Sequence, residues 1–254
     1  MFGFSSGLAW KELSEIRWKV IVSFLVLAVL GVSLVVLYGY ISDLLLTVPL
    51  PEVFRDQITW QMADFSRYLY ANWYSKNLYQ VATVIALIMG MNAVAGEVSR
   101  KTISFLLSFP LSRGQMAWTK YLVGLLALWV VIVGATLILL GSAVVAGRTV
   151  DTPYLLAGLP ASLAGAAFLY SLSFLFSVVT RDGVKALAAS GIIALALAVP
   201  SWFGRLRELS VFTLMSSATT LVTGQVEWAR TLVFLALSLV IYAAAAYKLQ
   251  REDF

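Results

Sequence analysis

The side chains that most often carry covalent chemistry are absent from this sequence. Its 254 residues contain no histidine and no cysteine, which excludes a Ser–His pair, an HExxH zinc site and thiolate chemistry. The phosphate-binding motif GxxxxGK[ST] is also missing, so we expect no ATP site. A catalytic Ser–Lys pair would require Lys120 or Lys185, and neither lysine has a convincing serine partner in the sequence. We therefore expect no catalytic residue, no metal site and no cofactor in this chain.

The stretch from Gly96 to Gln115 mixes charged and apolar residues and lies between two long runs without charge. Its apolar side chains recur at helical spacing and form one stripe, made of Ile103, Leu106, Leu107 and Leu111. The pattern predicts a short amphipathic helix. Periodicity alone leaves two functions open, an interfacial helix against lipid headgroups and a docking element for a cytoplasmic partner.

Two signals predict how this helix ends and how the next one begins. Pro110 cannot continue the hydrogen-bond ladder, so the helix is expected to end there. Ser112 and Gln115 have the spacing of a capping box, which predicts the start of a new helix.

The elements that position this stretch are predicted to be transmembrane helices. The chain is 61% hydrophobic and 12% charged, whereas a soluble domain carries about 25% charged residues. A helix needs roughly 20 apolar residues to cross the bilayer. Six segments qualify and none contains Asp, Glu, Lys or Arg: 20–41, 77–96, 121–147, 154–180, 186–203 and 231–247. We predict an all-α integral membrane protein with a single domain, 1–254, and a retained first span.

The distribution of basic residues predicts the orientation. Six spans place both termini on one side, and 11 of the 18 Lys and Arg residues lie on that side. The positive-inside rule therefore places both termini and the stretch 97–120 in the cytoplasm. The long loop 42–76 is then external, and its aromatic cluster, 60–74, is expected to be an interfacial belt, with an external gate as the alternative.

Two ladders of small residues recur at four-residue spacing in the predicted fourth and fifth spans. They are Ala157, Ala161 and Gly165, and Ala186, Ser190, Ala194 and Ala198. Small residues allow helices to approach closely. We expect packing within one chain, with part of a dimer seam as the alternative.

The stretch "GEVSRKTISFLLSFPLSR" resembles the signature region of type-2 ABC transporter permeases, with Lys101 where that family usually has glycine. Two flanking segments extend the resemblance over the whole chain. "WKELSEIRWK" is similar to the family's amphipathic N-terminal elbow helix, and "AAYKLQREDF" to its C-terminal tail.

The resemblance implies a membrane-spanning permease subunit of an ATP-binding cassette exporter, in which the stretch is a cytoplasmic coupling helix. The residues that it assigns to coupling with the ATPase are Glu97, Arg100, Thr102, Ile103, Phe105, Leu106, Leu107, Pro110 and Arg113. Glu97 is expected at the hinge between span and coupling helix, held by a cation or a helix N-terminus.

The resemblance also implies the partners and the location. ATP and Mg are expected on a separate ABC ATP-binding subunit, present in two copies, and a second permease chain is expected to complete a homodimer. The protein is expected in the cell membrane of a prokaryote, in contact with lipid and without nucleic acid. The alternative is a membrane scaffold, or an immunity or signalling component, that binds an ATPase without transporting a substrate.

Overall fold

The computed structural model describes residues 6–47, 52–101, 112–204 and 206–251, and no described residue lies in a strand. The first part of the chain forms α1 (Ser6–Val36), α2 (Tyr38–Thr47), α3 (Glu52–Met62), α4 (Phe65–Asn72), the π-helix η1 (Trp73–Leu78), α5 (Tyr79–Met91) and α6 (Ala95–Ser99). The remainder forms α8 (Arg113–Val145), α9 (Thr152–Leu156), α10 (Leu159–Thr180), α11 (Gly183–Ala198), the 3-10 helices η2 (Val199–Trp202) and η3 (Arg207–Leu209), α12 (Val211–Met215), α13 (Ala218–Thr223) and α14 (Trp228–Arg251).

Five helical segments among the described residues are long and apolar enough to cross a membrane. They are Ser6–Val36, Arg113–Val145, Thr152–Thr180, Gly183–Trp202 and Trp228–Arg251. The all-α membrane class is therefore confirmed, and five of the six predicted spans have a counterpart with different ends. The 33 residues of α8 extend about 50 Å at 1.5 Å per residue, well beyond the roughly 30 Å of hydrocarbon.

The predicted second span, 77–96, is wrong as a single helix. The π-helix η1 covers its first residues, α5 ends at Met91, and α6 begins only at Ala95. Tertiary contacts rather than local propensity produce the interruption, because side chains of α1 and α10 bond the backbone groups that the break releases.

The predicted separate elbow helix is also wrong. The segment 10–19 is the N-terminal part of α1, which continues without a break to Val36. No proline or glycine interrupts the sequence between Leu8 and Leu30, so nothing local ends the helix at the predicted boundary. The predicted coupling helix falls on residues 102–111, outside the described part of the chain.

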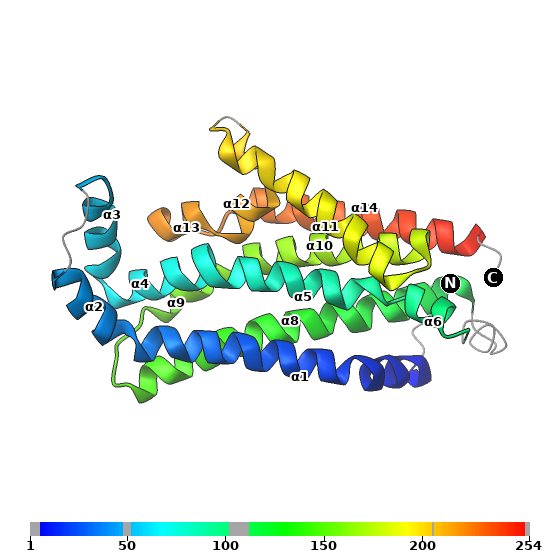
Figure 1. Cartoon of the computed structure of the whole chain (residues 1–254), viewed down its shortest axis with the longest axis horizontal. Coiled ribbons are helices and arrows are strands. Elements are labelled where there is room, and N and C mark those ends of the chain that lie inside the picture. Colours follow the sequence, from blue (N-terminus) through cyan, green and yellow to red (C-terminus); the bar gives the residue numbers. More distant parts are fainter. Residues whose placement is uncertain (1–5, 48–51, 102–111, 205, 252–254) are drawn as a thin grey trace.

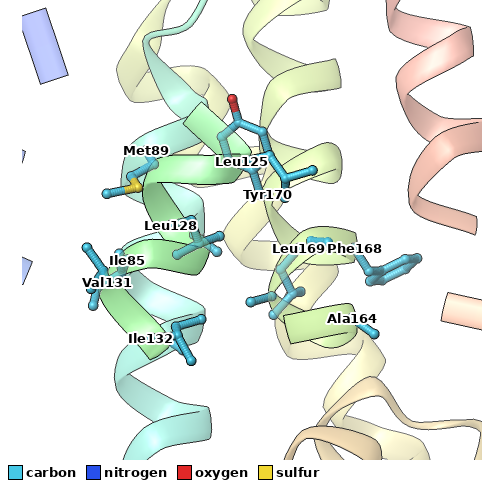
Figure 2. Close-up of a cluster of buried hydrophobic side chains, with 14 of the residues drawn as sticks. Ile85, Met89, Leu125, Leu128, Val131, Ile132, Ala164, Phe168, Leu169 and Tyr170 are labelled. Atoms are coloured by element: carbon cyan, nitrogen blue, oxygen red, sulfur yellow. The ribbon is translucent and has the colours of Figure 1, made fainter. Parts of the chain in front are cut away.

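The long helices pack as a bundle with both ends of the described chain on the same side (Figure 1). The starts of α1 and α8, the end of α14 and all of α6 lie there, which we call the α6 end, whereas α2 and α3 lie at the opposite end. The strongest pairings are α1 with α8, and α10 with both α14 and α5. Figure 2 shows the apolar core between α5, α8 and α10, where Ile85, Leu128 and Leu169 are buried.

Short polar side chains cap the N-termini of α8, α9 and α11. Ser112 and Gln115 form the predicted capping box at the start of α8, with N–H···O distances of 3.1 and 3.0 Å. Asp151 caps α9 and Asp182 caps α11 through their side-chain oxygens. Each bond satisfies a backbone N–H that has no partner within its own helix.

The aromatic cluster 60–74 is mostly core, so the prediction of an interfacial belt is wrong for four of its rings. Tyr68, Tyr70, Trp73 and Tyr74 are each at most 2% exposed, because α4 and η1 continue into the bundle instead of lying on its surface. Trp73 donates to Thr136 of α8 at 3.1 Å.

The ladders of small residues pack within the chain, as expected. Ala186, Ser190 and Ala194 are buried, and Ala161 and Gly165 lie in the core of α10. A Cβ atom on Gly165 would lie 2.1 Å from Cγ of Met215, so α10 and α12 approach closely there.

Candidate functional site

Charged side chains from three helices converge at the α6 end of the bundle. We call this group the ion cluster, and its members are Lys11, Glu12 and Glu15 of α1, Glu97 of α6 and Lys120 of α8. They sit beyond the apolar part of α1, which begins at Val20. The cluster joins the short α6 to the two helices beside it.

Lys120 is the centre of the cluster. Its side chain is 1% exposed, and its ammonium group lies 3.0 Å from Oε1 of Glu97 and in direct contact with Oε1 of Glu12. Glu97, 5% exposed, also accepts a hydrogen bond from Lys11. Oε1 of Glu97 therefore contacts two ammonium groups, one from α1 and one from α8.

Attraction between the lysines and the carboxylates stabilises this arrangement. One oxygen from each of Glu12, Glu15 and Glu97 lies within 4.8 Å of the others, so the carboxylates would repel one another without cations between them. Lys11 and Lys120 supply those cations. Removing one partner from a buried ion pair typically costs about 3–5 kcal/mol, because the other charge remains desolvated and unpaired.

A polar cavity of about 70 Å³ opens beside the cluster. Glu12, Lys19, Asn92, Arg100 and Tyr170 line it, so it contacts α1, α10 and both sides of the α5–α6 break. Lys19 donates to the carbonyl of Ile88 at 3.2 Å, near the point where α5 ends. The cavity is polar and roomy enough for a few water molecules.

Tyr170 and Gly124 set the spacing between α8 and α10 at this level. The Tyr170 hydroxyl lies 3.4 Å from the carbonyl oxygen of Lys120 and 3.3 Å from that of Tyr121. A Cβ atom on Gly124 would lie 2.2 Å from the same hydroxyl. Glycine at this position therefore allows the tyrosine to reach the α8 backbone next to the buried lysine.

Only some of the predicted coupling residues lie in the described part of the chain. Glu97 is buried in α6 and is held by cations, as expected, and Arg100 lies 3.8 Å from Glu15. Arg113 begins α8 and donates to the carbonyl of Gln250 at 3.4 Å, next to the end of α14. Thr102, Ile103, Phe105, Leu106, Leu107 and Pro110 lie outside the described residues.

Lys101 occupies a backbone conformation that favours glycine. Its φ is 57°, in the left-handed region, directly after α6 and its C-cap Arg100. Glycine adopts this conformation without the steric cost that a Cβ atom adds. Lysine therefore adopts a left-handed conformation here, at the position where the family that the sequence resembles usually has glycine.

Sequence reasoning missed four residues of the site: Lys11, Glu12, Glu15 and Lys120. Lys11 and Glu15 are spaced as an i, i+4 pair on one helix, 3.1 Å apart, which gave a weak local signal. Lys120 lies seven residues after the start of α8, which is about two helical turns from the helix end. No local signal predicts that it meets Glu12, 108 residues away.

Long apolar helices, a helical core and a cluster of ion pairs at one end define an integral membrane protein of the helical class. The family model described as ABC-2 family transporter protein matches residues 7–254. The chain therefore belongs to the ABC-2 transporter family and is a type-2 ABC transporter permease, a membrane component of an ABC system. Membership implies an ABC ATP-binding subunit as its partner. No curated protein matches the sequence.

Proposed function

We propose that this chain is the membrane-spanning subunit of an ABC exporter, which forms the translocation path and couples to a separate ATPase subunit. The observation that carries the proposal is the position of the ion cluster. It ties α6, which directly precedes the segment expected to dock on the ATPase, to α1 and α8. A force applied to that segment is then transmitted to two long helices through buried charges.

The complete transporter in this proposal contains two permease chains and two ATPase subunits, which hold ATP and Mg. The second permease chain is a copy of this one. The absence of a phosphate-binding loop from this sequence supports the separation of ATPase and permease.

The proposed membrane is the cell membrane of a prokaryote, with both termini in the cytoplasm. The grouping of both ends of the described chain at the α6 end supports this orientation, as does the excess of basic residues on that side. The second crossing is made by α4, η1 and α5 together, which run from Phe65 to Met91.

The coupling surface comprises the apolar side chains of residues 103–107 and the charged positions on either side of them. Phe105 and Leu106 supply the main contacts with the ATPase, and Glu97 and Arg113 anchor the ends of the segment. Burying a large apolar side chain contributes roughly 1.5–3 kcal/mol. Loss of two such side chains is enough to break a micromolar contact, which is worth about 8 kcal/mol in total.

Co-purification with the cognate ATPase tests the proposal. The double change Phe105→Ala and Leu106→Ala is expected to leave membrane insertion intact and to abolish capture of the ATPase. The matched control is Val184→Ala, which truncates a 76% exposed apolar side chain at the start of α11, also on the α6 end. If the double variant captures the ATPase and stimulates its turnover as the control does, the proposed coupling segment is refuted.

A further inference from the structure

The break between α5 and α6 leaves backbone groups without partners in their own helices. Helix α5 ends at Met91 and α6 starts at Ala95. The first N–H groups of any helix lack an intrahelical acceptor, and leaving a buried N–H without a partner is destabilising. Val94 and Ala95 are 1% and 0% exposed, so water does not satisfy them.

Ser177 of α10 supplies the missing acceptor. Its hydroxyl oxygen accepts hydrogen bonds from the backbone N–H of Val94 at 3.0 Å and from that of Ala95 at 2.9 Å. A serine oxygen has two lone pairs, one for each bond. The serine side chain is itself fully buried, so the three groups form a buried contact between α10 and the start of α6.

The backbone carbonyls before the break are bonded by other side chains. Ser173, one turn before Ser177 on α10, donates to the carbonyl of Leu87 at 2.7 Å. Lys19 of α1 donates to the carbonyl of Ile88. Ser173 thus bonds α5 alone, whereas Ser177 bonds the residues that lead into α6.

Close backbone packing surrounds the break on both sides. A Cβ atom on Gly90 would lie 2.7 Å from Cβ of Ser173 and 2.9 Å from the backbone nitrogen of Phe174. A Cβ atom on Gly183 would lie 2.0 Å from Oδ1 of Asn92. The break is therefore closely packed against α10 at Gly90 and against the start of α11 at Gly183.

We propose that Ser177 is a positioning residue, which fixes the direction in which α6 leaves the bundle by accepting hydrogen bonds from the N–H groups of the N-cap residue Val94 and of Ala95, the first residue of α6. Glu97 ties the middle of α6 to α1 and α8, and Ser177 ties its beginning to α10. Helix α6 consequently moves together with three long helices. The consequence for coupling rests on the proposed function, in which the segment after α6 docks on the ATPase.

Hydrogen–deuterium exchange on the purified full chain tests the positioning role without the ATPase. In Ser177→Ala, exchange of peptides covering residues 93–101 is expected to become about 10- to 100-fold faster, since two buried hydrogen bonds are lost. Exchange in α5 and in the rest of α10 should stay within about twofold of the unmodified chain. Ser177→Thr keeps the acceptor oxygen and should restore protection of 93–101.

Ser173→Ala is the matched control, because it removes a buried serine hydroxyl from the same helix without touching Val94 or Ala95. Equal exchange at 93–101 in Ser177→Ala and Ser173→Ala would overturn the proposal. Faster exchange spread uniformly over α5 and α10 would also overturn it, because Ser177 would then act only on general stability. If Ser177→Ala does not fold, Ser177→Thr decides the acceptor role. Exchange at residues 93–101 that is faster in Ser177→Thr than in the unmodified chain would then overturn the proposal.

The cognate ATPase provides the second arm of the experiment. Titration of the ATPase with permease in nanodiscs should show that Ser177→Ala raises the half-saturating permease concentration about tenfold and leaves the maximal ATP turnover unchanged. A fall in maximal turnover without a change in half-saturation would overturn the positioning role. If the unmodified permease does not bind the ATPase, the proposed function fails, and the exchange measurement still decides the role of Ser177.

Discussion

Replacement of Lys120 by methionine removes the central cation of the ion cluster while conserving the approximate length of the side chain. Glu12 then loses its direct partner, and its nearest remaining cation is Lys11, whose ammonium group lies 3.9 Å away. Glu97 retains its contact with Lys11. The perturbation therefore leaves one buried carboxylate, Glu12, with a side chain that is 8% exposed, without a direct partner.

The expected cost of Lys120→Met is about 3 kcal/mol. Loss of one partner of a buried ion pair costs about 3–5 kcal/mol, and the lower end applies here because Lys11 still attracts Glu12. In a chain of this size each kcal/mol corresponds to about 2–4 °C in Tm. Thermal unfolding in detergent, followed by size-exclusion chromatography, should show a fall of about 6–12 °C.

A second change separates charge imbalance from lost packing. Lys120→Met combined with Glu12→Gln removes both members of the broken pair, so the buried unpaired charge disappears. The double variant should recover at least half of the lost Tm. Lys185→Met is the matched control, since it makes the same substitution at an exposed position at the start of α11, and it should change Tm by less than about 2 °C.

Two results would refute this reasoning about the ion cluster. A Tm for Lys120→Met equal to that of Lys185→Met would show that the buried cation does not balance the carboxylates. A double variant less stable than Lys120→Met would show that Glu12 is stabilised without the lysine.

Three further predictions concern the backbone and the topology. Lys101→Gly relieves the left-handed φ of 57° and should raise the free energy of unfolding by about 1 kcal/mol, measured by denaturant titration; unchanged or lower stability would contradict the strain. Gly124→Ala should lower Tm because its Cβ would lie 2.2 Å from a buried tyrosine hydroxyl, whereas Gly141→Ala, in open space on the same helix, should raise it slightly. On intact cells, an impermeant thiol reagent should label a cysteine placed at the exposed Thr149 and not one placed at Ser6, and the opposite pattern would reverse the proposed orientation.

Much of the architecture could be predicted from the sequence because the relevant signals are local. Runs of about 20 residues without charge fold as helices in lipid, since every backbone group must be bonded within its own segment. The start of α8 was predictable because the Ser112 and Gln115 side chains bond each other's backbone N–H groups only three residues apart. Histidine and cysteine chemistry could be excluded from the composition alone, because the sequence contains neither residue.

The candidate site was only partly predictable. Glu97 was expected to be held by a cation or by a helix N-terminus, and Lys120, 23 residues further on, could not be named as its partner. The aromatic residues of α4 were assigned to an interfacial belt because composition does not distinguish a ring in the lipid interface from one in the core. Tyr70 of α4 and Trp73 of η1 are buried only because these two helices lead into α5 and pack inside the bundle.

Tertiary structure decided the features that join distant segments. The Lys120–Glu12 contact spans 108 residues and the Ser177–Val94 bond spans 83. Such contacts depend on which faces of the helices meet, and that choice is made by packing the whole bundle. The interruption of the second predicted span has the same origin: the stretch is apolar enough to continue as a helix, and it stops at Met91 where acceptors and donors from α10 and α1 bond its freed backbone groups.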